Sequence, residues 1–265
     1  MIAIYTSIYN EKNEQRKAEI IECLRKNTKS SFIDEIYLFV EGEAFLDVSS
    51  KKIRQQRIGW RPKYNDYFDL AANHQVTHSD LVLIANSDIY FDENINSLCH
   101  ALKPNQCAAL SRWNIKPSSA PVLLDRNDSQ DVWAFRGPLK KIQGDFPVGV
   151  PRCDNRILYE LKRTGYEVIN PSFSVRAYHL HSGIRQEYSG ENLAYTVDPP
   201  YAYLWPHNLW SLPRTILYNL RYPNARLSWR FDQRKFASSL PVRSAKKVWR
   251  MLKSWLGGVS GSEVP

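Results

Sequence analysis

One uninterrupted apolar run constrains the fold more than any other segment of the chain. Residues 81–85 read Leu-Val-Leu-Ile-Ala and lead directly into Asn86-Ser87-Asp88. An apolar run of this length without polar alternation is typical of a strand that is covered on both faces of a sheet. The sequence therefore predicts a buried strand over residues 80–85, with a polar loop at its carboxyl end.

Strand-like and helix-like segments alternate around this run. Short β-favouring segments are predicted as strands at 2–6, 35–40, 53–58 and 108–111, and helically spaced apolar residues predict helices at 10–26, 64–75 and 154–164. Gly165 follows the last of these helices, where glycine commonly ends a helix. Strands that alternate with helices predict an α/β fold, in which a mostly parallel sheet is flanked by helices.

Composition excludes several classes of protein. With 43% hydrophobic and 24% charged residues, the chain resembles neither a disordered polymer nor a fibre. No apolar run approaches the roughly 18 residues that a membrane span needs, and the start of the chain lacks the basic segment of a secretory signal. The four cysteines form no Cys-x-x-Cys pair, so we expect unpaired thiols in a cytoplasmic protein.

The positive charge is concentrated near the C-terminus. The net charge is +9, yet residues 201–256 hold eleven Lys and Arg, only one acid, and five of the eight tryptophans. We therefore predict a nearly neutral domain at 1–200 and a basic, Trp-rich extension at 201–265 that binds an anionic surface. Prolines interrupt the start of this extension, with a short helix expected at 214–220.

Residues 244–256 have the pattern of a basic amphipathic helix. Its apolar and cationic residues fall on different helical faces, with Val248, Trp249, Leu252 and Trp255 on the first and Lys246, Lys247, Arg250 and Lys253 on the second. Such a helix is typical of a peripheral contact with an anionic membrane surface. The alternative is a helix packed on the rest of the protein with solvated charges. No nucleic-acid recognition motif accompanies the charge, so we expect no nucleic-acid partner.

The loop after the apolar run carries two carboxylates, Asp88 and Asp92. Ligands bind at the carboxyl ends of strands in open α/β sheets, and carboxylate oxygens suit Mg²⁺ or Mn²⁺. We expect Asp88 to bind a ligand, whereas Asp92 precedes Glu93-Asn94 and is expected to cap a helix. Because the sequence lacks both common glycine-rich phosphate loops, a metal ion is the simplest means to hold a nucleotide.

Residues 86–92, Asn-Ser-Asp-Ile-Tyr-Phe-Asp, resemble the D-x-D region of GT-A type nucleotide-sugar glycosyltransferases, with Asn86 in place of the first acid. Further segments resemble, in consistent order over residues 1–190, the bacterial members that build surface polysaccharides. They are 61–68, 129–135, 149–155, 170–172 and 178–182, with Arg185 and Tyr188. The resemblance implies a GT-A fold and sugar transfer from a nucleotide-diphosphate donor, assisted by Mn²⁺ or Mg²⁺.

The resemblance also implies the metal ligands and the base. Asp88 would bind the cation together with a late histidine, His181, while His179 lies on the same face of the expected strand and is the competing ligand. Asp154 would deprotonate the acceptor hydroxyl in an inverting reaction. Its alternative role is a helix N-cap, and Asp131 is the other candidate base.

Sugar and donor contacts complete the expected site. Asp131 and Trp133 are assigned to sugar binding, since a carboxylate suits hydroxyls and an indole suits the apolar ring face; a strand-edge acid beside a core tryptophan is the alternative. Donor binding is assigned to Thr6, Ser7, Asn10, Arg61, Asn65, Asn86, Asp88 and Arg185. Of these, Arg185 would pair with the diphosphate.

These features together predict a glycosyltransferase, peripheral on the cytoplasmic face of a bacterial membrane. It would move a sugar from a nucleotide-diphosphate donor to a saccharide or a lipid-linked glycan. One alternative is a non-catalytic peripheral membrane module with a degenerate GT-A domain, in which D-x-D has become Asn-x-Asp. The other is a sugar nucleotidyltransferase, which we expect to carry a glycine-rich basic loop after the first strand, and residues 6–12 contain no glycine.

Overall fold

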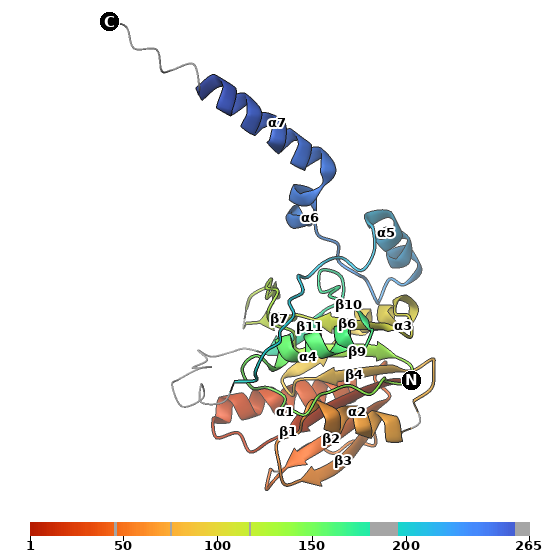
Figure 1. Cartoon of the computed structure of the whole chain (residues 1–265). Coiled ribbons are helices and arrows are strands. Elements are labelled where there is room, and N and C mark those ends of the chain that lie inside the picture. Colours follow the sequence, from red (N-terminus) through yellow and green to blue (C-terminus); the bar gives the residue numbers. More distant parts are fainter. Residues whose placement is uncertain (45–46, 75, 117, 181–195, 258–265) are drawn as a thin grey trace, which may run out of the picture. The chain divides into compact units, whose positions relative to one another are not determined.

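The computed structural model describes residues 1–44, 47–74, 76–116, 118–180 and 196–257, which are drawn in colour in Figure 1. The chain forms two compact units, Met1–Trp229 and Arg230–Pro265. The first unit is longer than the domain of 200 residues expected from composition. Residues 201–229 belong to it because backbone hydrogen bonds attach them, such as those from Ala202 N to Asn155 O (3.0 Å) and from His207 N to Asn170 O (2.8 Å).

A seven-stranded sheet forms the centre of the first unit, with the strand order β10-β6-β9-β4-β1-β2-β3 in the described residues. Its strands are β1 (Ile2–Ile8), β2 (Glu35–Glu41), β3 (Ile53–Ile58), β4 (Leu81–Ala85), β6 (Gln106–Leu110), β9 (Val132–Arg136) and β10 (Glu167–Ile169). Neighbouring strands pair in parallel, except that β9 is antiparallel to both β4 and β6. The expected mostly parallel α/β sheet is therefore confirmed.

A second, four-stranded sheet was not expected from the sequence. It has the order β5-β11-β7-β8 and consists of β5 (Ile89–Phe91), β7 (Arg112–Ile115), β8 (Val122–Leu123) and β11 (Ala177–Leu180). These strands have two to four residues each, which leaves little room for a period-2 pattern, and only β11 overlaps a strand that the sequence predicts, the one that carries His179. β5 and β7 follow shortly after β4 and β6, so the second sheet lies at the carboxyl edge of the first.

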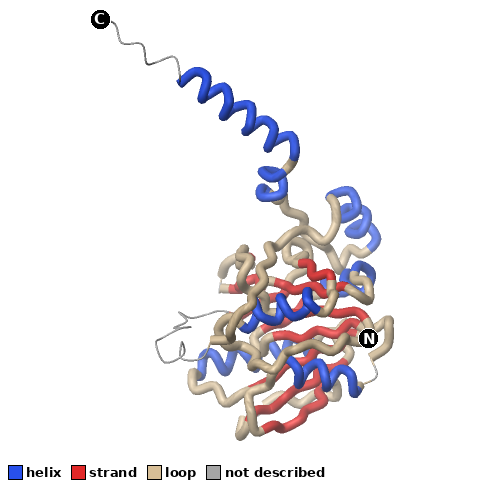
Figure 2. Tube along the Cα trace, viewed as in Figure 1, coloured by secondary structure: helices blue, strands red, loops and turns tan. Residues whose placement is uncertain are grey.

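Helices cover the large sheet, as the blue and red segments of Figure 2 show. In the first unit they are α1 (Glu14–Lys29), α2 (Tyr64–Asn73), the 3₁₀ turn η1 (Glu93–Asn96), α3 (Ser97–Ala101), α4 (Cys153–Arg163) and α5 (Leu212–Arg221). Asn13 begins α1 as an N-cap whose side chain accepts a hydrogen bond from Arg16 N, which satisfies one otherwise unpaired amide of the first turn. Gly165 follows α4 with φ +84°, a left-handed conformation that glycine adopts without steric cost.

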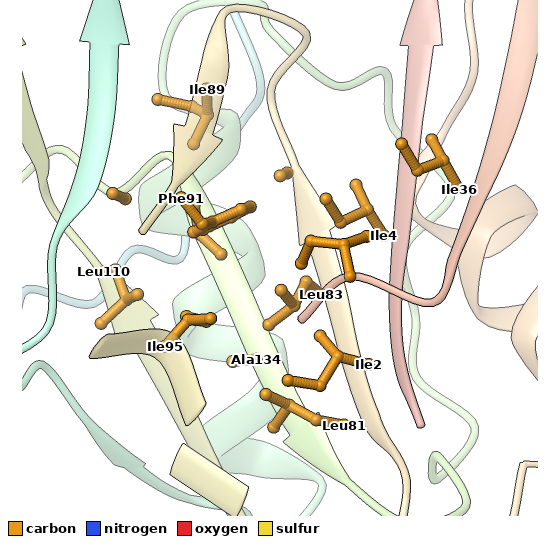
Figure 3. Packing of buried hydrophobic residues seen from close by; sticks show 14 of the residues in the cluster. Ile2, Ile4, Ile36, Leu81, Leu83, Ile89, Phe91, Ile95, Leu110 and Ala134 are labelled. Atoms are coloured by element: carbon orange, nitrogen blue, oxygen red, sulfur yellow. The ribbon is translucent and has the colours of Figure 1, made fainter. Parts of the chain in front are cut away.

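Alternate residues of the central strands build two separate cores. Ile4, Leu83 and Ala134 face one side of the sheet, where they pack with Leu24 of α1 (Figure 3). Their neighbours along the strands face the other side and pack with aromatic residues of α2 and apolar residues of α4. Because both faces are covered, β1 and β4 carry apolar residues at nearly every position.

The second unit contains α6 (Gln233–Ser238) and α7 (Leu240–Gly257). The predicted amphipathic helix at 244–256 is thus part of a longer helix. Trp249 and Leu252 of α7 are exposed, with 68% and 49% of their surface accessible, and Lys246 and Arg250 are exposed as well. Among the described residues, no helix combines the length and the hydropathy that a membrane span requires.

The position of Leu83 yields a stability prediction. Its side chain is fully buried, so Leu83→Ala should lower the free energy of unfolding by about 2–5 kcal/mol through lost contacts and a cavity. Val122→Ala is the matched control, because Val122 is 62% exposed and should cost less than about 0.5 kcal/mol. Urea denaturation followed by circular dichroism measures both, and equal losses would contradict the assignment of Leu83 to the core.

Candidate functional site

The carboxyl edge of the large sheet brings together polar residues from separate strands. β4 and β9 are antiparallel with Ala85 opposite Val132, so the end of β4 meets the start of β9. Asn86 therefore lies beside Asp131: its backbone N–H donates to Asp131 O (3.0 Å), and its side-chain Nδ2 donates to Asp131 Oδ1 (3.1 Å). Both residues were expected in the site, and the strand pairing explains why they meet.

Asp88 lies in the same loop and is a buried carboxylate, only 3% exposed. Its Oδ2 accepts a hydrogen bond from Arg16 Nη2 at the start of α1 and lies 3.0 Å from His179 Nε2 of β11. Burial lowers the pKa of Arg16, but the charge of Asp88 and its hydrogen bond outweigh burial, so the net pKa of Arg16 is raised. Arg16 is therefore a permanent cation against Asp88.

His179 is held in one orientation by its other ring nitrogen. Nδ1 is 2.9 Å from Asn114 Oδ1, and the same oxygen accepts from Arg112 Nε (3.2 Å), so it acts as an acceptor and Nδ1 carries a proton. The other ring nitrogen, Nε2, therefore faces Oδ2 of Asp88. An imidazole whose second nitrogen donates to an oxygen is the usual arrangement of a metal-binding histidine.

These contacts form one continuous network that we call the buried polar chain. Arg112 links its two parts, because it contacts both Asn114 and Asp131. Arg112 Nη1 forms an ion pair with Asp131 Oδ1 (3.2 Å), and Asp131 is only 3% exposed. The buried polar chain runs through Arg16, Asp88, His179, Asn114, Arg112, Asp131 and Asn86. It joins α1, the loop after β4, β11, β7 and the start of β9, and so fixes the carboxylates relative to one another.

Asp154 lies in the first turn of α4. The N-cap of α4 is Arg152, so the capping alternative for Asp154 is wrong. Its oxygens accept from Gln130 N (3.3 Å) and Asn155 N (3.1 Å). Burial and then the charge of Asp131 raise the pKa of Asp154 to about 7, against the opposing effect of these backbone hydrogen bonds. A half-buried carboxylate with such a pKa can take up and release a proton near neutral pH.

The expected donor residues of β1 also lie at this edge. Thr6 and Ser7, from the end of β1, line a narrow hollow together with Asn27, Asn86 and Ser87. Thr6 Oγ1 is buried there without a hydrogen-bond partner among the residues that the structure describes. Asn10 is exposed beyond the end of β1.

Two other expected donor residues support a loop of the protein. Arg61 donates from Nε to Val148 O (2.8 Å) and from Nη2 to Gly149 O (3.0 Å). Asn65 accepts through its side chain from Gly144 N (2.8 Å). Both therefore hold residues 144–149, which precede the α4 turn that carries Asp154.

Trp133 is a core residue in this structure, in keeping with the alternative considered above. It is 1% exposed, and its ring meets Tyr64 edge to face, with centroids 5.1 Å apart. β9 turns Trp133 toward α2 and α4, so the indole is not available to a sugar. His181 and Arg185 lie outside the described residues, and their expected roles stay predictions.

Asp92 has the expected capping role, because its side chain accepts from Asn94 N at the start of η1. Sequence reasoning missed Arg16, Arg112 and Asn114. No local pattern marks these three residues. For Arg16 one signal was present: it lies three residues after Asn13, the N-cap of α1, and so falls in the first turn of a helix that begins close to the end of β1.

Asp88 and His179 are the residues that fit a divalent cation. No group of three or more His, Cys, Asp or Glu side chains within the described part of the chain could hold a metal ion. A carboxylate and an imidazole are nevertheless sufficient protein ligands where a diphosphate supplies further oxygens. Because Nδ1 of His179 donates its proton to Asn114, Nε2 is the nitrogen that faces Asp88 and can bind a metal ion. The pair fits such an ion, with Arg16 as the competing cation.

A larger hollow lies elsewhere in the first unit. It has a volume of about 420 Å³ and is lined by residues of η1, α3, α5 and the segment that follows α5, among them Cys99, His100 and Tyr222. It shares no residue with the buried polar chain, so size alone does not locate the site.

No protein-family model matches the chain, and no curated protein matches it. Similar solved structures include a mannosyltransferase from Pyrobaculum calidifontis in complex with GDP-Man and Mn²⁺, with 13% identity, a TM-score of 0.41, and coverage of 70% of this chain and 57% of that one. TarS 1–349 of S. aureus has 11% identity, a TM-score of 0.42, and coverage of 68% and 60%.

A putative glucose-1-phosphate thymidylyltransferase from Bacillus anthracis, in complex with a sucrose, is also similar. It has 11% identity, a TM-score of 0.38, and coverage of 64% of this chain and 87% of that one. The chain spans less than two thirds of the length of the mannosyltransferase and of TarS 1–349. The function proposed below therefore rests on the site of this chain.

The raised pKa of Asp154 predicts a pH-dependent stability. The unfolded chain releases this proton near pH 3.8 and the folded chain near pH 7, so between these values the folded state binds more protons and its stability falls as the pH rises. Asp154→Asn should remove this contribution, and Asp69→Asn, at an exposed position, should not. Melting temperatures from pH 4 to pH 7.5 measure the difference, and parallel profiles for wild type and Asp154→Asn would contradict the raised pKa.

Proposed function

We propose that the chain is a glycosyltransferase that moves a sugar from a nucleotide-diphosphate donor to a hydroxyl of a saccharide or lipid-linked glycan, with inversion at the anomeric carbon. One observation carries the proposal. Asp88 and His179, with Oδ2 and Nε2 3.0 Å apart, lie at the same edge of the sheet as Asp154, a carboxylate whose pKa is raised to about 7 by burial and by the charge of Asp131. This supplies one group for a leaving diphosphate and one for an acceptor proton.

The donor half of the site would bind the diphosphate. Asp88 and His179 would hold Mn²⁺ or Mg²⁺, which when bound neutralises the negative charge that develops on the leaving group. Asn114 keeps Nε2 of His179 directed at Asp88. Arg16 forms an ion pair with Asp88, and its guanidinium would become available to phosphate oxygens when Asp88 binds the cation.

The acceptor half of the site would take up a proton. Transfer with inversion breaks the bond between the anomeric carbon and the diphosphate oxygen, and forms a bond from that carbon to the acceptor oxygen. The hydroxyl proton moves to Asp154, whose two oxygens otherwise accept only weak backbone hydrogen bonds. Near neutral pH a large share of Asp154 is ionised, which a general base requires.

Asp131 is less suited to be the base. Its Oδ1 already accepts from Arg112 and Asn86, whereas Oδ2 is buried without a hydrogen-bond partner in the described part of the chain. Asp131 instead raises the pKa of Asp154 by its charge. A contact between Oδ2 and a sugar hydroxyl is consistent with the sugar-binding role expected from the sequence.

The exposed residues of α7 in the second unit support one class of acceptor. α7 exposes Trp249 and Leu252 together with Lys246 and Arg250, which suits peripheral contact with an anionic membrane surface. We therefore favour a lipid-linked acceptor in cell-surface polysaccharide synthesis, and a position on the cytoplasmic face of the membrane.

The two alternatives make different products. A sugar nucleotidyltransferase releases pyrophosphate from a nucleoside triphosphate, whereas a glycosyltransferase releases a nucleoside diphosphate from a sugar nucleotide. A degenerate module releases neither and binds no nucleotide. A panel of sugar nucleotides and triphosphates, assayed for both products, separates all three functions.

Metal dependence is the first functional prediction. Asp88→Asn should lower the Mn²⁺-dependent affinity for a nucleoside diphosphate at least about tenfold, because losing even an outer-shell contact of a metal ligand costs about 10–100-fold. Asp92→Asn is the control in the same loop, where the side chain caps η1. Calorimetry with UDP and GDP, with Mn²⁺ or with a chelator, gives the affinities. A Mn²⁺ effect that survives in Asp88→Asn would exclude Asp88 as a ligand.

The base yields the second functional prediction. Asp154→Asn keeps one amide oxygen that can accept from Gln130 N or from Asn155 N, but it accepts no proton, so kcat should fall about 10²–10⁴-fold. In the wild type, kcat should decline below about pH 7 as Asp154 becomes protonated. Asp131→Asn should move this decline to lower pH, since it removes a charge that raises the pKa. A loss below tenfold in Asp154→Asn and a larger loss in Asp131→Asn would place the base at Asp131.

A further inference from the structure

Helix α5 in the first unit has its apolar side turned outward. Leu212, Ile216, Leu217 and Leu220 are 43%, 50%, 67% and 76% exposed. At 100° per residue these four fall within one arc of α5. A surface helix normally turns such a stripe toward the core. The stripe of α5 is instead exposed, so its burial would require an apolar environment outside the unit.

The orientation of α5 is fixed by hydrogen bonds at one edge of the apolar stripe and by buried side chains on the opposite face. Asn219 donates from Nδ2 to Leu227 O (2.9 Å) and accepts from Leu227 N (2.8 Å). Thr215 and Tyr218 are buried, at 2% and 8% exposure, and Tyr218 packs against Trp210 with centroids 5.1 Å apart. A rotation of α5 that buried its leucines would break the paired Asn219 bonds.

Cationic residues border the apolar face. Arg214 lies over the ring of Trp210, 4.5 Å from its centroid, and Arg221 over Tyr222 at 5.5 Å. Both arginines are exposed. Residues 201–229 contain three arginines and no acid, so the segment that carries this face has a net positive charge.

We propose that α5 is a membrane-contact surface of the first unit, separate from α7, and that its occupant is an anionic lipid bilayer. The aliphatic face enters the interface, while Arg214 and Arg221 pair with lipid phosphates, the arrangement typical of interfacial helices. Bilayer binding needs no catalysis, so this inference goes beyond the proposed reaction and stands or fails without it.

Charge and size favour a bilayer over a second copy of the chain. A two-fold contact would bring Arg214 and Arg221 of one copy against the same residues of the other. A helix of ten residues is also only about 15 Å long, and a stable dimer buries about 800 Å² on each partner. A bilayer accepts a small apolar face and attracts the flanking charge.

The test uses full-length variants and two kinds of vesicle, equimolar phosphatidylglycerol and phosphatidylcholine or phosphatidylcholine alone. Leu217→Ser with Leu220→Ser should weaken binding to the anionic vesicles on the order of tenfold, from the loss of two exposed leucines. Val122→Ser, which replaces a residue 62% exposed on β8, should bind like the wild type. Trp249→Ser with Leu252→Ser should weaken binding through α7, and the two pairs together should nearly abolish it.

A fluorescent label reports the contact directly. An environment-sensitive dye on Leu220→Cys should shift to the blue with anionic vesicles, and the same dye on Gln55→Cys of β3 should not. Both labels are placed in a Cys99→Ser background, because Cys99 is half-buried and the other cysteines are buried. Circular dichroism and thermal melting establish that each variant is folded.

Several outcomes would overturn the proposal. Unchanged vesicle binding by the α5 pair, or a dye at position 220 that stays in water, excludes a bilayer contact. A wild-type dimer that the α5 pair converts to monomer, with vesicle binding intact, identifies a second copy as the occupant. A dye at position 220 that is already shifted without vesicles, and returns to water in the α7 pair, identifies α7 as the cover.

Discussion

The site depends on how a buried carboxylate is compensated. Asp88 is 3% exposed, and an ionised carboxylate at such a position is stable only when it is paired and hydrogen-bonded. Arg16 provides the charge pairing, and His179 Nε2 lies 3.0 Å from the same carboxylate oxygen. They come from α1 and β11, so the charge of Asp88 can be accommodated only when both elements have reached the end of β4. The electrostatic requirement of one residue thus ties the second sheet and the first helix to the large sheet.

The same network also contributes, after the larger effect of burial, to the raised pKa of Asp154. Arg112 is shared between Asn114, which orients His179, and Asp131, whose charge raises the pKa of Asp154. A change at one end of the buried polar chain therefore alters the electrostatics at the other. Asp154 and Asp88 therefore lie in different electrostatic environments at one sheet edge: burial and the charge of Asp131 raise the pKa of Asp154, whereas Asp88 is paired with Arg16.

The sequence predicts local features better than contacts between distant segments. The apolar runs identify β1, β2 and β4, and the polar loop after β4 identifies Asp88, because these signals are contained within a few residues. The antiparallel β9 and the strands β5, β7 and β8 of the second sheet have no such signal, whereas β11 overlaps the strand expected around His179. Arg16 looks like an ordinary helix residue until α1 and β4 are placed side by side, and its contact with Asp88 spans 72 positions.

The sequence left two features ambiguous, the role of Trp133 and the orientation of α5, and each ambiguity has a physical reason. A tryptophan suits both a sugar ring and a core, and only the direction in which β9 turns Trp133 decides for the core. For α5, a helix near residues 214–220 was expected, but helical spacing does not tell which face is outward. The hydrogen bonds between Asn219 and Leu227 fix which face of α5 points outward. They require the chain to turn back after α5, which the apolar pattern of the helix does not predict.

The proposed reaction requires that Asp88 and His179 hold a cation against a nucleotide diphosphate. Crystals grown with Mn²⁺ and a nucleoside diphosphate can be measured at the manganese absorption edge. We expect an anomalous peak beside Asp88, Nε2 of His179 and the phosphate oxygens, with Arg16 moved from Asp88 to the phosphates. A bound nucleotide with no peak beside Asp88, and with Arg16 still paired to Asp88, would contradict the proposed cation site.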